Sequence, residues 1–254
     1  MKDYIKSVLD KKDRLDGRKF DEFRKPIVIT NDVSSKAEGS ARVKIGDTEV
    51  IAGVKMDVGK PYPDSQDKGN LMTGVEFLSV ASPEFLPGPP GPQAIELARI
   101  LDRGIRESKM IDFKKLCITE GELVWNVIVD IYTINDAGNL IDASALAAVS
   151  ALKNAVLPKL VDDKVQFGDF TKTPVPLTLT PVSCTVYKIG KHLIVDPTKE
   201  EEDAADGRLT VAVSESGNIH AMQKGMEAGF TIDEADKAIG MAKKCIEKLR
   251  KELK

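Results

Sequence analysis

Four stretches in the first part of the chain alternate hydrophobic and polar positions with a period of two, the pattern of half-buried β-strands. They are residues 26–33, 39–59, 75–82 and 123–134. The second stretch is interrupted at Gly46 and Asp47, as a hairpin turn would require. The pattern therefore predicts strands in all four stretches and a hairpin in the second.

A period of 3.6 residues predicts helices elsewhere. They cover residues 4–12, 93–108 and 141–152 and a C-terminal segment that opens with the capping box Thr231–Glu234. The helix at 141–152 is apolar nearly all round and has small side chains, so we expect it to be buried against a sheet. The apolar stripe of the last helix is Ala235, Ile239, Ala242, Ile246 and Leu249. Five prolines between residues 83 and 92 predict a stiff connector.

Strand patterns return in the second part of the chain. They cover residues 183–190, 191–197 and 207–214, with an acidic loop at 200–206 before the last of them. Strands with interspersed helices in both parts predict an α+β fold of two related layers. We place the boundary near residues 157–176, which gives a first unit at 1–160, including the N-terminal helix, and a second at 161–254, including the C-terminal helix.

Composition is that of an ordinary folded protein, with 254 residues of which 42% are hydrophobic and 30% charged. Because the net charge is −3, nucleic-acid binding would require a local basic patch or a surface shared with a partner. The three cysteines lie far apart and form no CxxC pair, which favours neither a disulfide framework nor a zinc site. No apolar run is long enough to span a membrane, so we expect a cytoplasmic protein with no membrane partner.

Three arginines share one face of the helix at 93–108. At 100° per residue, Arg99, Arg103 and Arg106 fall within about a 60° arc opposite the apolar side. We call these three residues the arginine stripe. Taken alone, these arginines would more often lie on a solvated helix face. Glu96 precedes Arg99 by three residues and Asp102 precedes Arg106 by four, and both are the spacings of ion pairs along a helix.

The turn that joins the strand at 123–134 to the next helix is a candidate phosphate site. A glycine-bearing turn that leads into a helix N-terminus commonly holds an anion on its backbone N–H groups. No Lys or Arg stands in the turn, which reads Gly138-Asn139-Leu140. From the residues alone, the turn is a phosphate site, the remnant of one or a plain connection.

Several linked motifs resemble the RNase PH family, and more closely its non-catalytic archaeal exosome ring subunits. They are "RLDGR" at 14–18, "EGSARVKIGDTEV" at 38–50, "GKPYPD" at 59–64, "PGPPGPQAIELARILDRGIRES" at 87–108 and "DAGNLIDASALAAVSAL" at 136–152. The resemblance implies an RNase PH-like fold of two ribosomal protein S5 domain 2-like units packed together. It also implies a hexameric ring that degrades RNA from the 3′ end by phosphorolysis.

The resemblance also interprets the turn. Active members of the family carry a Gly-Ser-Arg or Gly-Thr-Arg triplet there, whose guanidinium holds the attacking phosphate. Leu140 replaces that group, and a helix end alone contributes only about 0.3 to 1 kcal/mol. Active members also place an aspartate at the head of the strand "LTVAV", where this chain has Arg208, with Asp206 close by. Gly138, Asn139 and Leu140 are thus interpreted as a degenerate phosphate site in a chain with no catalytic residues and no metal site.

For partners, the resemblance implies a catalytic RNase PH-like subunit in a trimer of heterodimers, RNA-binding cap subunits with S1 or KH domains, and single-stranded RNA. The subunit itself would use no cofactor, and inorganic phosphate and Mg²⁺ would act at the partner's active site. Arg99 and Arg103 would contact RNA phosphates, with Arg106 as a weaker candidate. The N-terminal helix could contact the cap.

Two alternative functions stay open. One is a self-sufficient phosphorolytic exoribonuclease that uses Asn139 and an arginine from elsewhere, and the other is a scaffold that never touches RNA. The remaining candidates favour structural roles. The acidic residues at 200–206 could hold Mg²⁺ but are more typical of a solvated loop. His192 and His220 have no evident partner in the sequence and are interpreted as structural.

Overall fold

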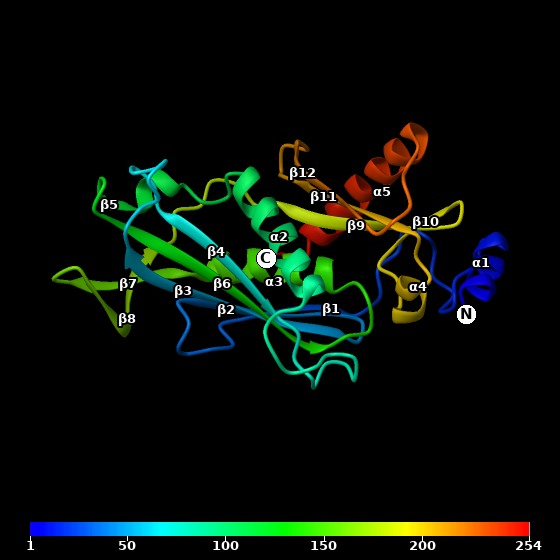
Figure 1. The fold of residues 1–254 in the computed structure, drawn as a ribbon, viewed down its shortest axis with the longest axis horizontal. Helices are drawn as coiled ribbons and strands as arrows, with labels where there is room; N and C mark the ends of the chain where they lie inside the picture. Colours follow the sequence, from blue (N-terminus) through cyan, green and yellow to red (C-terminus); the bar gives the residue numbers. More distant parts are fainter. Residues whose placement is uncertain (254) are drawn as a thin grey trace.

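A six-stranded sheet forms one layer of the protein in the computed structural model, which describes residues 1–253 (Figure 1). Its strands lie in the order β1 (Ile27–Asn31), β2 (Gly39–Ile45), β3 (Thr48–Gly59), β6 (Leu123–Asn135) and β4 (Asn70–Glu76), with β5 (Cys117–Thr119) also paired to β6. All pairings are antiparallel except that of β4 with β6. The hairpin predicted at Gly46 is the β2–β3 connection, where Gly46 has a φ of 57°.

The second layer is a four-stranded antiparallel sheet. Its strands lie in the order β10 (His192–Val195), β9 (Val182–Ile189), β11 (Gly207–Val213) and β12 (Ile219–Gly225). The helix α5 (Ile232–Arg250) packs on β9 and β11, and it buries Ala238, Ala242, Cys245, Ile246 and Leu249. The predicted capping box is present, because the Thr231 hydroxyl accepts from the Glu234 N–H and the Glu234 carboxylate accepts from the Thr231 N–H.

Two helices connect the sheets into one core. The helix α3 (Leu140–Asn154) contacts β2 and β3 of the first sheet and β9 of the second, and α2 (Pro92–Glu107) contacts β4 and β12. Every residue of α3 from Leu140 to Leu152 is buried, as its apolar, alanine-rich sequence predicts. The predicted α+β fold class is confirmed, and the turn at Gly138 lies where the two sheets meet.

Short elements complete the structure. They are α1 (Lys2–Asp10), η1 (Phe113–Leu116), α4 (Lys199–Asp203) and the hairpin strands β7 (Val156–Val161) and β8 (Lys164–Pro174). The helix α1 buries Ile5 and Leu9 in a small second core with Tyr187 and Ile194. Within residues 1–253, no helix is long and apolar enough to cross a membrane.

Two local predictions are wrong, and a third is incomplete. The strand expected at 75–82 is instead β4, which ends at Glu76. A turn follows it, in which the Ala81 N–H donates to the Leu78 carbonyl at 2.9 Å, and the Phe77 ring stacks on Phe85 with centroids 4.5 Å apart. The expected acidic loop contains α4, which begins with a Thr198 capping box. The predicted apolar stripe of α5 is present in Ala242, Ile246 and Leu249, and the partly buried Ile239 packs against the core beside them. The prediction missed Ala238 and Cys245, which are fully buried, and Ala235 is only half-buried.

The segment expected to separate the two units forms the β7–β8 hairpin. Its turn residues Asp162 and Asp163 both have positive φ, which aspartate tolerates better than most side chains. The proposed division at residue 160 falls within β7 and stays a prediction.

Candidate nucleic-acid interface and the closed turn beside it

The turn between β6 and α3 is shaped by one glycine and held by local hydrogen bonds. Gly138 has a φ of 95°, and a Cβ atom added there would lie 2.6 Å from the Pro197 carbonyl oxygen. The Asp136 carboxylate accepts from the Gly138 N–H at 3.0 Å, and the Thr48 hydroxyl donates to the Gly138 carbonyl at 2.6 Å. Only glycine therefore fits this position, because the chain is left-handed there and the backbone of the next unit touches it.

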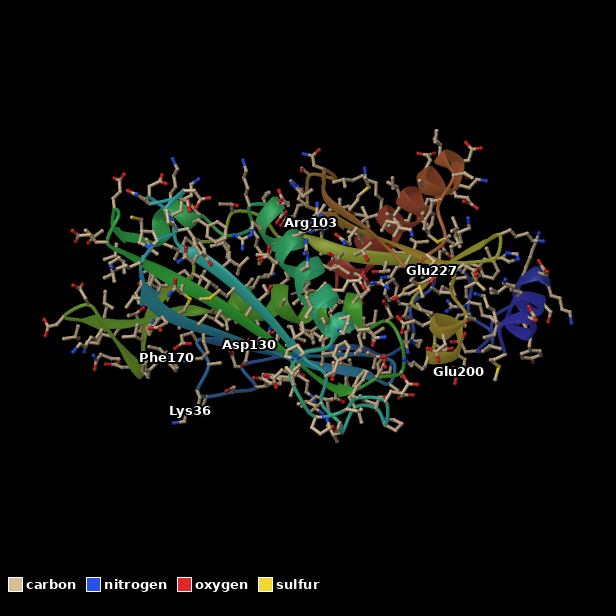
Figure 2. The ribbon with its side chains drawn as sticks, in the orientation of Figure 1. Lys36, Arg103, Asp130, Phe170, Glu200 and Glu227 are labelled. Atoms are coloured by element: carbon tan, nitrogen blue, oxygen red, sulfur yellow. The ribbon has the colours of Figure 1, made fainter. Side chains whose placement is uncertain are left out.

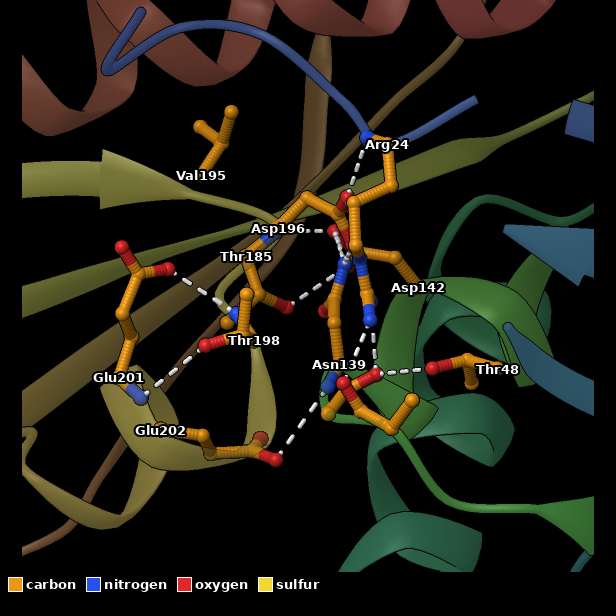
Figure 3. A network of polar contacts seen from close by, with 12 residues as sticks. Arg24, Thr48, Asn139, Asp142, Thr185, Val195, Asp196, Thr198, Glu201 and Glu202 are labelled. Atoms are coloured by element: carbon orange, nitrogen blue, oxygen red, sulfur yellow. Dashed lines mark hydrogen bonds and ion pairs between the residues drawn. The ribbon is translucent and has the colours of Figure 1, made fainter. Parts of the chain in front are cut away.

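Asn139 lies at the centre of a buried polar network, drawn in Figure 3. Its side-chain amide donates to Asp142 Oδ2 at 3.1 Å and to Asp196 Oδ1 at 2.9 Å. Asp196 in turn accepts two hydrogen bonds from the Arg24 guanidinium, which also donates to the carbonyls of Ala137 and Gly138. Arg24 thus binds the carbonyl side of the turn, and its charge is compensated by Asp196 rather than offered to a ligand.

Asp142 is a fully buried carboxyl group in the first turn of α3. Oδ2 accepts from the Thr185 N–H at 3.1 Å, and Oδ1 accepts from the Thr185 hydroxyl at 2.8 Å, which itself lies 2.9 Å from the Thr210 hydroxyl. Burial raises the pKa of Asp142 to about 7 against the opposing effect of these hydrogen bonds. If Oδ1 carries a proton, the direction of this hydrogen bond reverses, and the Thr185 hydroxyl can then donate to Thr210. The group therefore joins α3 to β9 through both of its oxygens.

Glu202 places a second carboxylate at the start of α3. Its Oε2 atom accepts from the Asn139 N–H at 3.2 Å, and its Oε1 atom accepts from the Tyr187 hydroxyl at 2.6 Å. Burial raises the pKa of Glu202, while the hydrogen bond from Tyr187 opposes that rise. The neighbouring Glu201 holds α4 in place through a fully buried ion pair with Arg14.

A cavity of about 200 Å³ opens beside Leu140 and Ile141, at the start of α3. Its charged lining residues are Glu96, Asp136, Glu202, Asp203, Lys199 and Arg208. Arg208 binds Glu96 at 2.6 Å, and Lys199 binds Asp136 at 3.2 Å. With four acidic and two basic side chains, the cavity is unfavourable for a divalent anion.

The structure also places the two residues at the head of β11. Asp206 faces α1, where its carboxylate binds Lys2 at 2.6 Å and accepts from the Gly190 N–H. Arg208 lines the cavity beside Leu140. A cationic side chain therefore lines the cavity, and the aspartate two residues before it points toward α1.

The arginine stripe is exposed along α2, and Figure 2 shows Arg103 at the molecular surface. Arg99 and Arg103 line a groove of about 450 Å³ beside Thr73 and Gly74 of β4. Within residues 1–253, Arg99 makes no hydrogen bond or ion pair, and Arg103 makes a single hydrogen bond, to Gln223 at 3.2 Å. The stripe thus contains guanidinium groups that the chain itself does not neutralise.

Arg106 differs from its two neighbours. Its guanidinium binds Asp102 at 2.7 Å and donates to the Leu71 carbonyl at 3.2 Å. The pKa of Arg106 is raised by the hydrogen bond to Asp102. The ion pair expected between Glu96 and Arg99 is replaced by that of Glu96 with Arg208. Arg99 and Arg103 are therefore the more available members of the stripe.

The other candidates occupy structural positions. Among the described residues, no group of His, Cys, Asp and Glu side chains is arranged to hold a metal ion. His192 Nε2 lies 2.9 Å from Asp10 Oδ1, and His220 Nε2 lies 2.8 Å from the Ser214 hydroxyl. Sequence reasoning missed these two partners, and also the roles of Arg24, Asp142, Asp196 and Glu202. For Asp142 a signal was present, because it is an acid within an otherwise apolar helix.

Comparison with family models gives two consecutive matches. Residues 22–158 match the RNase PH model described as "3' exoribonuclease family, domain 1", and residues 180–245 match the model for domain 2 of that family. Together they cover most of the chain and both sheets.

Curated relatives are similar over nearly their full length. The chain is 47% identical over 244 residues to the Methanopyrus kandleri protein named "Exosome complex component Rrp42", covering 95% of this chain and 91% of that protein. It is 47% identical over 255 residues to the protein of the same name from Archaeoglobus fulgidus, covering 100% and 95%.

A solved structure has the same fold. A chain of the structure titled "archaeoglobus fulgidus exosome with RNA bound to the active site" superposes with a TM-score of 0.91 at 45% sequence identity. The match covers 100% of this chain and 97% of that one.

Proposed function

The chain belongs to the RNase PH-type 3′ exoribonuclease family, and from this premise we propose that it is the non-catalytic ring subunit of an archaeal exosome. The observation that carries the proposal is the closed turn, by which we mean residues 136–140. Leu140 stands where active members carry the phosphate-binding arginine, and the cavity beside it is lined by more acids than bases. A dianion would find the Arg208 guanidinium of that cavity already paired with Glu96, and it would meet carboxylates instead.

In this proposal the catalytic RNase PH-like subunit is the partner, and three heterodimers form the ring. The phosphate and the Mg²⁺ act in the partner's active site, and this chain needs no cofactor of its own. Cap subunits with S1 or KH domains bind the ring, and the complex works in the cytoplasm. The support is the similarity to curated exosome components and to an exosome structure over the full chain length.

The contribution of this chain to RNA binding comes from the arginine stripe. Arg99 and Arg103 contact phosphates of single-stranded RNA along the groove between α2 and β4, and Arg106 is a third, weaker contact. Contacts to the backbone position RNA of any sequence and weaken as salt rises. By holding the strand at the subunit boundary, the stripe helps to form the active site of the neighbouring subunit.

The experiment that tests the proposal compares the purified chain alone with the chain mixed with its catalytic partner. Each sample receives 3′-labelled RNA, inorganic phosphate and Mg²⁺. We expect nucleoside diphosphate release from the mixture and none from the chain alone, and we expect the mass of the mixture to be that of three heterodimers. Diphosphate release by the chain alone would instead support the self-sufficient exoribonuclease.

A further inference from the structure

We propose that the Glu202 carboxylate is an internal substitute for phosphate at the closed turn. Phosphate binding is then prevented by this carboxylate as well as by the absence of an arginine at position 140. This inference deepens the proposed function and rests on it, because it treats the turn as a former phosphate site. It concerns one class of ligand, the divalent oxyanion, with inorganic phosphate as the probe.

The first support is the hydrogen bond that Glu202 makes. The Asn139 N–H lies at the entrance to α3, and it donates to Glu202 Oε2 at 3.2 Å. Backbone N–H groups at a helix N-terminus are what such a site would offer to a phosphate oxygen. The carboxylate therefore takes a donor that a bound anion would need. Figure 3 shows this contact across the gap between α4 and the turn.

A second support is the orphaned oxygen of Asn139. This side chain is fully buried, and its Oδ1 atom finds no hydrogen-bond partner within residues 1–253. Its nitrogen is bound by two carboxylates, Asp142 and Asp196. Three acidic side chains, those of Asp142, Asp196 and Glu202, therefore bind the N–H groups of Asn139. A site for an external anion would instead leave such donors available to the ligand.

The fold fixes Glu202 in this position. The helix α4 begins at a Thr198 capping box and is anchored by the buried Arg14–Glu201 pair. The Tyr187 hydroxyl holds the other carboxylate oxygen at 2.6 Å. Pro197 and Thr198 contact Gly138 so closely that no Cβ atom would fit between them. The carboxylate is therefore placed by rigid neighbours and does not depend on a flexible loop.

This arrangement predicts the effect of restoring an arginine at position 140. Leu140 and Glu202 line the same cavity, so the guanidinium introduced by Leu140→Arg would lie near the Glu202 carboxylate. A charge-assisted pair between them would neutralise the new cation before phosphate could use it. Restoring the family's arginine alone should leave the site closed. Removing the carboxylate as well should open it.

The test measures binding of inorganic phosphate to the full chain by calorimetry, for the native protein, Leu140→Arg, and Leu140→Arg combined with Glu202→Ala. We expect no binding by the native protein, and at least about 10-fold tighter binding by the double variant than by Leu140→Arg. The matched control combines Leu140→Arg with Glu200→Ala, which removes an exposed acid of the same helix and should behave like Leu140→Arg.

If Glu202→Ala fails to fold, Glu202→Gln replaces it, because glutamine keeps the shape and removes the negative charge that would pair with the new arginine. The gain in phosphate affinity should then be smaller than with Glu202→Ala, since the amide oxygen can still accept from the Asn139 N–H. Equal phosphate affinity of Leu140→Arg and the double variant would overturn the inference, and so would binding by the native chain. Failure here is separate from failure of the proposed function, since the RNA assay of the unmodified chain involves neither variant.

Discussion

The closed turn and the arginine stripe differ in whether their charged side chains are paired within the chain. Around the turn, the charged side chains of Arg24, Asp196 and Glu202 bind partners within the chain. On α2, the Arg99 side chain forms no hydrogen bond or ion pair among the described residues, and it lines an open groove. One region uses its polar groups to hold the two sheets together, and the other exposes two guanidinium groups, those of Arg99 and Arg103, that form no ion pair within residues 1–253.

This contrast indicates where each function lies. A buried polar network contributes to stability, and its disruption is costly because unpaired groups remain in a low-dielectric interior. An exposed guanidinium contributes little to stability, yet it can neutralise a nucleic-acid phosphate. Substitutions near the turn should therefore change folding, and substitutions in the stripe should change RNA binding. The predictions below test this separation, beginning with the largest effect.

Breaking the buried pair beside the turn should have the largest effect on stability. Arg14→Ala leaves the Glu201 carboxylate buried without its partner, and it removes donors from the carbonyls of Val195 and Asp196. We expect the free energy of unfolding to fall by about 3–5 kcal/mol, measured by urea denaturation. The control is Lys191→Ala, whose ion pair with Asp10 is exposed and should contribute less than about 1 kcal/mol. Similar losses in both variants would contradict the account.

Asp142 should make stability depend on pH. Its pKa is raised to about 7 by burial, so the folded protein favours the protonated form. The stabilisation is present in full below the ordinary pKa of aspartate and is lost as the pH rises through about 7. Asp142→Asn removes this dependence, because the amide does not titrate and its nitrogen can take the place of Oδ1 beside the Thr185 hydroxyl, 2.8 Å away.

The measurable quantity is the difference in unfolding free energy between Asp142→Asn and the native chain. Relative to the native chain, the variant should gain about 3 kcal/mol between pH 5 and pH 8. Denaturation curves at four pH values in that interval would determine this slope. Parallel stability profiles for the two proteins would show that Asp142 titrates in the folded state as it does in the unfolded state.

Removing one hydrogen bond from the turn should have a smaller effect. Thr48→Val keeps the shape of the side chain but loses the hydroxyl that donates to the Gly138 carbonyl. We expect a loss of about 1 kcal/mol in thermal or urea unfolding. The exposed Thr30 of β1 provides the control, since Thr30→Val should change stability by less than about 0.5 kcal/mol.

Substitutions within the arginine stripe should have the smallest effects on stability. Arg106→Ala removes an exposed pair with Asp102, one turn away on the helix, and should cost about 0.3–0.5 kcal/mol. Arg99→Ala should cost less, because that side chain has no partner to lose within residues 1–253. RNA affinity of the assembled ring should show the reverse order, with the larger loss for Arg99→Ala. A larger RNA effect at Arg106 would reverse the assignment of the available arginines.

Local sequence patterns predicted the elements around both regions, because period and capping signals lie within a few residues. The strand β6, the turn at Gly138, the helix α3 and the face of α2 that carries Arg99 all follow from such patterns. The network could not be predicted in this way. It joins Asn139 to Glu202, 63 residues apart, and Asp142 to Thr185, 43 residues apart.

The short helix α4 was missed for a different reason. Five residues are too few to show a helical period, so the acidic composition suggested a loop. A usable signal was present nonetheless. Thr198 and Glu201 have the capping-box spacing that correctly predicted the start of α5 at Thr231 and Glu234.

The most direct test of the central claim is the RNA affinity of the reconstituted ring when this chain carries Arg99→Glu and Arg103→Glu. We predict at least about 10-fold weaker binding, slower phosphorolysis and a smaller dependence of affinity on salt, with unchanged stability. Lys243→Glu with Lys244→Glu on α5 is the charge-matched control and should leave RNA affinity unchanged. Unchanged RNA affinity and phosphorolysis in the double arginine variant would contradict the account and indicate a scaffold that does not touch RNA.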